Sequence, residues 1–278
     1  MRKTILLAVI LFLTGAAVSQ SIWAQRFGRG SRESDAPRPV FSKEGEFHFV
    51  RLEYTDNPQY HRGGGFASRS ATGSGWWMVD WPEADDHFTT GLQRLTRIDV
   101  AEPHHFGLNS DEIYDHPWIY VTQAGWWGLS DAETKRLGEY LLRGGFLVTD
   151  DFWGAEQWSN FERTMARALP KRPIYDIGER DSVMHVLYDI EEKDRTFIPG
   201  TRHLRMGAGG RTVVQQPPGS DPIWRAMYDD SNRMVVAINF NTDVGDAWEY
   251  ADAPEYPAEM TTLAYKYGVN YVVYAMTH

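Results

Sequence analysis

The alternation of apolar and amphipathic segments between residues 118 and 169 is the sequence feature that most constrains the fold. Two short runs rich in β-branched and aromatic residues, 118–122 and 146–150, are typical of buried strands. Each is followed by a longer segment, 130–143 and 155–169, in which apolar residues recur at helical spacing. Strands and helices in alternation predict a doubly wound α/β fold, with a mostly parallel sheet and helices on both of its faces.

The first of these helices carries signals at both ends. Ser130 and Glu133 form a capping-box pattern, and Gly144 and Gly145 follow the last turn, where glycine commonly ends a helix. The other predicted elements, in chain order, are a strand at 47–52, a helix at 82–97, short strands at 174–177 and 183–188, a hairpin strand at 212–215, a turn at 229–232, a strand at 233–241 and a helix at 258–277.

The first 24 residues have the pattern of an export signal. Two basic residues precede an apolar stretch at 5–18, which is too short to cross a membrane comfortably. Cleavage is expected after Ala24, and a cut after Ser19 is an alternative. We therefore expect an exported protein, periplasmic or extracellular, whose mature chain has no membrane span.

The rest of the chain is expected to form one domain. Residues 25–45 are rich in Arg, Ser, Gly and Pro without periodicity, which predicts a flexible lead. Residues 46–278 contain no repeat and no linker, so we assign them to a single α/β domain. A glycine- and serine-rich loop at 61–75 near its start is too long to be a simple turn.

Composition excludes several classes of function. Cysteine is absent, so no thiol can act as a nucleophile, lipid anchor or metal ligand, and no disulfide can form. Without the signal, 26 of the 28 basic residues face 38 acidic ones, a formal net charge of −12. This charge disfavours nucleic acid and anionic membranes as partners, and it suits a cationic or neutral ligand.

Two adjacent aspartates, Asp150 and Asp151, end the predicted strand at 146–150. Ligands of open α/β sheets bind beyond the carboxyl ends of the strands, so one carboxylate could bind a sugar hydroxyl, an amine or a cation, or act as a general base. In the alternative, Asp151 caps the following helix and Asp150 bonds loop backbone. Adjacent residues of an extended chain point to opposite sides, so we expect the two to differ in role.

A second acidic group follows the predicted strand at 233–241. Hard cations prefer such oxygen-bearing side chains, but their spacing does not match the twelve-residue calcium loop. We interpret the segment as a solvated acidic loop in which Asp246 is a candidate partner for Asp150 or Asp151. The members of this group are Asn241, Asp243, Asp246, Glu249 and Asp252.

The chain holds 11 tryptophans, which either fill the core or line a surface that stacks on sugar rings. Trp81 adjoins Asp80, and this pairing of an aromatic face with a carboxylate suits a sugar site. The same residues could instead close an edge of the core and cap a helix. The candidate ligand-binding residues are Asp80, Trp81, Trp126, Trp127, Trp153 and Trp248.

Histidine gives only one candidate for catalysis. His185 lies on the predicted strand at 183–188, where it is either a general acid or base or, as the simpler interpretation, a satisfied core residue. The chain has no H-E-x-x-H motif, and the adjacent His104 and His105 are expected in a solvated loop. We therefore predict no metal site and no cofactor.

Several segments resemble, in the same order, those of the DUF4159 family of bacterial proteins. The resemblance covers about residues 46–278 and implies a doubly wound α/β domain. Within it, residues 119–152 resemble the core of the class I glutamine amidotransferase-like fold, especially its sugar-related ThuA-like members. It assigns no activity. The matching segments are FVRLEY, DWPEADDHFTTGLQRLT, YLLRGGFLVTDDFWG, MYDDSNRMVVAINFNTDVGDAWEYAD and LAYKYGVNYVVYAMTH.

The resemblance also bears on chemistry and location. In amidotransferases, the turn after the matching strand carries a nucleophilic cysteine, whereas here it holds Asp150 and Asp151, so that reaction does not carry over. DUF4159 members commonly resemble cell-envelope proteins, and some are encoded near MoxR-type ATPases and von Willebrand A proteins. These gene neighbours imply an envelope partner from a MoxR and von Willebrand A system.

Two classes of function remain open at this point. The first is an exported binding or assembly module whose acidic and aromatic crevice holds a glycan or an envelope protein. The second is a hydrolase of carbohydrate or peptidoglycan, with Asp150 or Asp151 as the base and Asp246 as its partner. Glycosidase carboxylates lie roughly 5 to 9.5 Å apart, a distance that the sequence does not supply.

Overall fold

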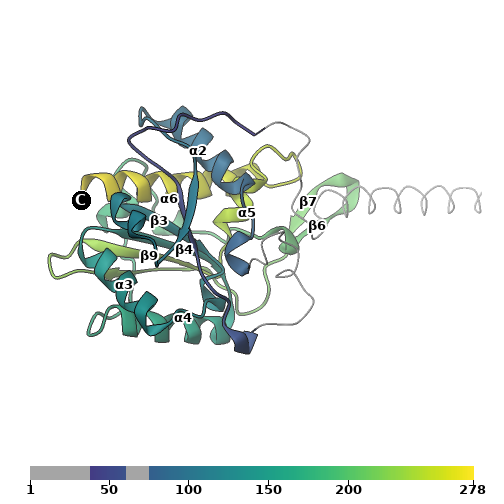
Figure 1. Ribbon diagram of the computed structural model, residues 1–278. Coiled ribbons are helices and arrows are strands. Elements are labelled where there is room, and N and C mark those ends of the chain that lie inside the picture. The colour runs from purple at the N-terminus through teal and green to yellow at the C-terminus, as the bar shows by residue number, and fades with distance from the viewer. Residues whose placement is uncertain (1–37, 61–74) are drawn as a thin grey trace, which may run out of the picture.

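The fold is built on one seven-stranded sheet. A computed structural model describes residues 38–60 and 75–278, and its strand order is β2-β1-β3-β4-β9-β8-β5 (Figure 1). The first five strands in this order are parallel, and β8 and β5 add two antiparallel neighbours. The strands are β1 (Val50–Glu53), β2 (His104–Gly107), β3 (Trp118–Thr122), β4 (Phe146–Phe152), β5 (Tyr175–Asp176), β8 (Ile223–Tyr228) and β9 (Met234–Phe240).

Helices cover both faces of this sheet, as Figure 1 shows. One face carries α2, α5 and α6, and the other carries α3 and α4, and each face buries its own cluster of apolar side chains. The prediction of a doubly wound α/β fold is therefore confirmed. The helices are α2 (Glu83–Leu95), α3 (Asp131–Leu142), α4 (Gly154–Ala168), α5 (Val244–Glu249) and α6 (Ala258–Thr277).

Local sequence signals explain where several elements begin and end. The predicted capping box is present: the Ser130 hydroxyl accepts from the Glu133 backbone N–H, and Glu133 accepts from the Ser130 N–H. Gly144, just after α3, has φ 112, a conformation that favours glycine. Asp229 closes the predicted turn between β8 and β9, where its N–H donates to Arg233 O.

Two predictions of local structure are wrong. Residues 104–107 form the edge strand β2, not a loop, because they pair in register with β1. Residues 183–188 form no strand; they hold the end of a 3₁₀ turn, Ser182–Met184, and the bends after it. The predicted export signal, most of the flexible lead and most of the loop at 61–75 lie outside the described residues.

A small hairpin of β6 (Leu204–Met206) and β7 (Thr212–Val214) stands apart from the main sheet, near its carboxyl edge in Figure 1. Its second strand, β7, confirms the predicted hairpin strand at 212–215. Within residues 38–60 and 75–278, no helix is both long enough and apolar enough to cross a membrane.

A buried ion pair joins β1 to α2. The Arg51 guanidinium is fully buried, donates to both carboxylate oxygens of Asp85 and also donates to the backbone oxygens of Trp77 and Val79. Its charge lies 5.1 Å from the centroid of the Tyr120 ring on β3. Arg51 therefore fixes α2 and the chain before it against the centre of the sheet.

We expect Asp85→Ala to destabilise the fold by about 3 to 5 kcal/mol, because it leaves a buried guanidinium without its carboxylate. Asp131→Ala is the matched control, since Asp131 also lies in the first turn of a helix and pairs with an arginine, but its side chain is fully exposed. The control should cost about 1 kcal/mol or less. Urea unfolding of both variants measures the difference, and equal losses would contradict a special role for the buried pair.

Candidate functional site

The carboxyl ends of the parallel strands carry unusual backbone. Gln123 after β3, Asp151 in β4 and Asn241 after β9 have φ values of 54, 50 and 59, in the left-handed region that non-glycine residues rarely adopt. Asp80, before α2, has φ 65. Such residues concentrate at binding and catalytic sites. The edge where open α/β sheets bind ligands is therefore also the edge with the most constrained turns.

Asp150 is an internal anchor of this edge. Its carboxylate is fully buried and accepts from the Tyr120 hydroxyl at 3.1 Å, the Thr242 hydroxyl at 3.2 Å, and the backbone N–H groups of Val244 and Gly245 at 2.8 and 2.9 Å. These contacts tie β4 to β3 and to the start of α5. Four donors occupy the side chain, so its role is to position α5.

Asp151 points elsewhere, as expected for an adjacent residue. Its carboxylate is buried and accepts from the Gln123 amide, the Trp153 indole N–H at 2.6 Å and the Arg202 guanidinium at 3.0 Å. It does not cap α4, whose N-cap residue is Trp153 and has no side-chain cap. The helix-cap alternative for Asp151 is therefore wrong.

The acidic segment after β9 is a buried helix, so its interpretation as a solvated loop is wrong. Asp243 caps α5 by accepting from the Asp246 N–H at 2.9 Å, and it is 1% exposed. Asp246 accepts from the N–H and hydroxyl of Thr201, and Asp246 and Glu249 are each 8% exposed. The helix forms because Val244 and Trp248 pack inward, which turns the carboxylates toward the sheet edge.

Five carboxylates meet at this edge, and we call them the acidic cluster: Asp80, Asp151, Asp243, Asp246 and Glu249. One oxygen each of Asp80, Asp151 and Asp243 lies within 4.8 Å of the other two. The same holds for Asp80, Asp246 and Glu249. Asp80 belongs to both trios, and its Oδ2 atom is buried without a hydrogen-bond partner in the described residues.

Burial and mutual repulsion hold protons in this region. Burial, then the charge of Asp246, raises the pKa of Asp80 well above its usual value, and burial and Asp151 do the same for Asp243. Burial and Asp246 raise the pKa of Glu249 to about 8. These carboxyl groups resist ionisation because no positive charge balances them. A bound cation would replace the protons and stabilise the ionised carboxylates.

Arg202 supplies positive charge at one side of the acidic cluster. Burial opposes its charge, but Asp151 and Asp243 outweigh that effect and raise its pKa. Its guanidinium also lies over the Trp153 ring, 4.7 Å from the centroid. One arginine beside five carboxyl groups leaves a large excess of negative charge whenever those groups ionise.

The other candidate tryptophans divide into two groups. Trp81, Trp126 and Trp153 are partly exposed, and Trp126 stacks on Trp76 with ring centroids 5.8 Å apart. The Trp126 turn adjoins β4, because Gln123 donates its N–H to Asp150 O. Of the candidate tryptophans, these three keep part of their surface exposed.

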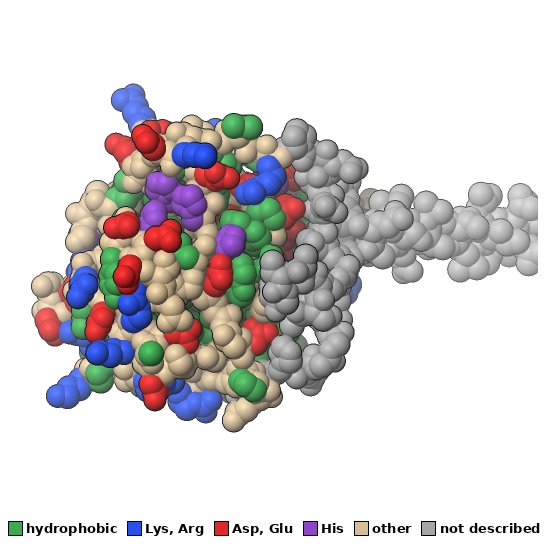
Figure 2. All heavy atoms as spheres, viewed as in Figure 1, with side chains coloured by type: hydrophobic (Ala, Val, Ile, Leu, Met, Phe, Trp, Pro, Cys, Tyr) green, Lys and Arg blue, Asp and Glu red, His purple; other side chains and the backbone are tan. Residues whose placement is uncertain are grey.

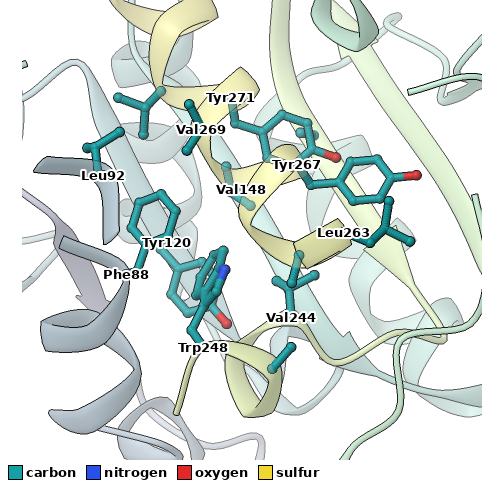
Figure 3. Close-up of a cluster of buried hydrophobic side chains, with 14 of the residues drawn as sticks. Phe88, Leu92, Tyr120, Val148, Val244, Trp248, Leu263, Tyr267, Val269 and Tyr271 are labelled. Carbon is teal, nitrogen blue, oxygen red and sulfur yellow. The ribbon is translucent and has the colours of Figure 1, made fainter. Parts of the chain in front are cut away.

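Trp127 and Trp248 lie in the core instead. Both are fully buried: Trp127 stacks on Phe161 at 5.5 Å, and Trp248 packs between Phe88 and Tyr120 (Figure 3). Neither ring offers a face to a ligand. Their role is to pack η5 (Ala124–Trp126) and α5 onto the sheet.

His185 makes its contacts away from the acidic cluster. Its ring nitrogens contact Asp189 Oδ1 at 2.8 Å and Glu179 O at 2.7 Å. The backbone hydrogen bond with Glu179, and then that with Asp189, raises its pKa. These contacts hold the turn after Ser182–Met184 in place, and they give His185 a local structural role.

Several residues of the site were not found from the sequence. Arg202 lies in a glycine- and proline-rich segment without a motif, and Gln123 and Tyr120 look like ordinary strand residues. Glu249 was recognised as acidic but not as buried. The alternation of apolar Val244, Ala247 and Trp248 with acidic residues is the signal that could have indicated a helix here.

The sequence matches a known protein family. A model of the DUF4159 family, described as a domain of unknown function, matches residues 64–276. The chain belongs to the DUF4159 family. No curated protein matches it. As a DUF4159 member, the chain receives no activity from its family, so function has to be argued from the acidic cluster.

We expect Glu249→Gln to stabilise this DUF4159 protein at pH 8 and to have little effect at pH 4. The folded-state pKa of Glu249, about 8, exceeds the unfolded value near 4.5, so the wild type loses stability as pH rises between these values. The neutral amide removes that loss, which amounts to at most a few kcal/mol. Thermal unfolding in metal-free buffer from pH 4 to 9 measures this loss of stability. If stability depends on pH in the variant as it does in the wild type, Glu249 does not carry the proton in the folded state.

Proposed function

We propose that this protein is an exported binding module that holds a divalent cation in the acidic cluster and uses it to bind an oxygen-rich ligand. The observation that carries the proposal is the pair of carboxylate trios, each within 4.8 Å, that share Asp80. Two oxygens on a Ca²⁺ ion can be at most about 5 Å apart, since each lies 2.3 to 2.6 Å from it. The trios meet that condition.

Calcium is the cation that we propose for these trios. It takes about six to eight oxygen ligands in variable geometry, whereas Mg²⁺ demands near-ideal octahedral geometry at about 2.0 to 2.1 Å and keeps several waters. The Asp80 Oδ2 atom, which has no hydrogen-bond partner in the described residues, and the carboxylates at α5 form a set of oxygens without nitrogen or sulfur donors. Such a donor set favours a hard cation over zinc or copper.

The ligand that we favour is a glycan of the cell envelope. A bound cation coordinates sugar hydroxyls, and the partly exposed indoles of Trp81 and Trp153 lie beside Asp80 and Asp151 to stack on ring C–H groups. An envelope protein, such as a component of a MoxR and von Willebrand A system, is the alternative ligand. The export pattern at residues 1–24 supports an envelope location.

Binding accounts for the geometry better than hydrolysis does. In glycosidases, the two carboxylates lie roughly 5 to 5.5 Å apart in retaining enzymes and further apart in inverting ones. Here the nearest carboxylate oxygens of each trio lie within 4.8 Å of one another, closer than in either class of glycosidase. Asp150 is fully occupied by four donors and cannot serve as a base.

We also propose that the scaffold is of the glutamine amidotransferase-like kind. The order β2-β1-β3-β4-β9 is that of a flavodoxin-like sheet, with its switch point between β1 and β3. Asp151, in left-handed conformation near the end of the central strand β4, lies where amidotransferases place their nucleophile. Without cysteine, the inherited turn presents a carboxylate, which supports ligand binding in place of acyl transfer.

Calcium should raise the melting temperature of the purified protein, and Asp243→Asn should abolish this response. Asparagine keeps the cap of α5 but removes one charge of the trio, so the metal-free variant should remain folded. At a free calcium concentration 100 times Kd, the stabilisation should be about 2.7 kcal/mol. Titration calorimetry with Ca²⁺ and Mg²⁺ gives the affinities.

Asp230→Asn is the control, because Asp230 is an exposed aspartate that pairs with Arg172 outside the acidic cluster. It should keep the full calcium response. An envelope-glycan panel, probed with and without Ca²⁺, then tests the ligand. Absence of any calcium response in the wild type would refute the cation site, whereas calcium binding without calcium-dependent glycan binding would favour a protein partner.

A further inference from the structure

Three histidines from separate segments meet at the opposite edge of the sheet. His48 precedes β1, His104 opens β2, and His116 follows the turn η4 (Asp111–Asp115), two residues before β3 begins. The centroid of the His48 ring lies 5.0 Å from each of the other two, which are 6.1 Å apart. Figure 2 shows histidine side chains gathered in a patch on the visible face. We call these three residues the histidine cluster.

We propose that the histidine cluster binds one divalent transition-metal ion of the class of Zn²⁺, Ni²⁺ or Cu²⁺. This site is separate from the calcium site and does not depend on it. Imidazole is the ligand that these three ions share. Three rings that each place a nitrogen about 2.0 to 2.1 Å from one ion have centroids roughly 5 to 6 Å apart, which is the spacing found here.

His48 already has the surroundings of a metal ligand. The backbone oxygen of Glu102 accepts a hydrogen bond from its ring, while its Nδ1 atom is buried and has no partner among the described residues. Metal-binding histidines usually donate one ring N–H to a carbonyl and keep the other nitrogen for the ion. The lone pair of His48 Nδ1 is therefore left for a ligand.

The other two rings need only to turn. As they stand, nitrogens of all three rings do not come within 4.8 Å of one another, a condition that the acidic trios do meet. Rotation of His104 and His116 about χ2 exchanges ring carbon for nitrogen and leaves the ring centroids nearly in place. Both side chains are partly exposed, so the rings can turn and an ion can enter.

The lowered pKa values of His48 and His116 favour metal binding. Burial, and then the neighbouring His104, lowers the pKa of His48, and burial also lowers the pKa of His116. Neutral imidazole is the form that binds metal. A bound ion would join the starts of β1, β2 and β3, so we assign the site a structural role.

Titration calorimetry with ZnCl₂ tests the proposal on the purified protein, produced without a histidine tag. We expect one Zn²⁺ per chain, with binding at least tenfold weaker in each of His48→Gln, His104→Gln and His116→Gln. His105→Gln is the matched control, because His105 neighbours His104 but contacts Glu53 instead. It should bind Zn²⁺ as the wild type does.

Two further measurements separate the outcomes. Circular dichroism of each metal-free variant establishes that it is folded, and Asp243→Asn should leave Zn²⁺ affinity unchanged. Co²⁺ should give the visible absorption of a nitrogen-ligated ion in the wild type and not in His48→Gln. Any of three results would overturn the histidine site: no Zn²⁺ binding in the wild type, wild-type Zn²⁺ affinity in the three cluster variants, or loss of Zn²⁺ binding in Asp243→Asn.

Discussion

The buried carboxylate of Asp150 is the contact on which the carboxyl edge of the sheet depends. It accepts hydrogen bonds from β3, from the chain after β9 and from the first two residues of α5. Burial, and then the charge of Asp151, raises the pKa of Asp150 to about 8, while its hydrogen bonds oppose that rise. Each of the four donors would be unpaired without this carboxyl group. Asp150 thereby sets where α5 begins, and every carboxylate of α5 takes its place from that start.

The acidic cluster is not explained by stability alone. Buried carboxylates of like charge oppose folding, and hydrophobic residues of similar volume would fill the same space at lower cost. The surrounding glycines show how closely the structure is built around these carboxylates. A Cβ at Gly200 would lie 2.4 Å from an Asp243 oxygen, and one at Gly245 would lie 2.7 Å from Asp80 Oδ2. Space is thus reserved for carboxylate oxygens at this edge, as the proposed cation site requires.

Much of the fold was predictable because its signals are local. The capping box of Ser130, the glycines after α3 and the apolar periodicity of α6 each depend on a few neighbouring residues. The edge strand at 104–107 was not predictable in this way, since two histidines and a glycine give no strand signal. It forms through pairing with β1, which is a tertiary effect.

The site was predictable only in part, for a related reason. Asp150 and Asp151 could be placed at the carboxyl edge because the strand before them was clear. Their separate roles depend on partners far along the chain, Arg202 for Asp151 and the start of α5 for Asp150. The histidine cluster was even harder to predict, since its three rings come from segments separated by up to 68 residues. No local pattern joins them.

The two proposed metal sites lie at opposite ends of the same strands, and a chain of buried contacts runs between those ends. β1 and β3 pair at Arg51 and Tyr120, at the switch point of the sheet. Arg51 lies over the Tyr120 ring, and the Tyr120 hydroxyl donates to Asp150, which holds α5. An ion on the histidine cluster would fix the spacing of β1 and β3 at their starts. Because packed interiors transmit strain, a change in that spacing would shift the position of Tyr120. Through the hydrogen bond from Tyr120 to Asp150, it would also shift the carboxylates of α5.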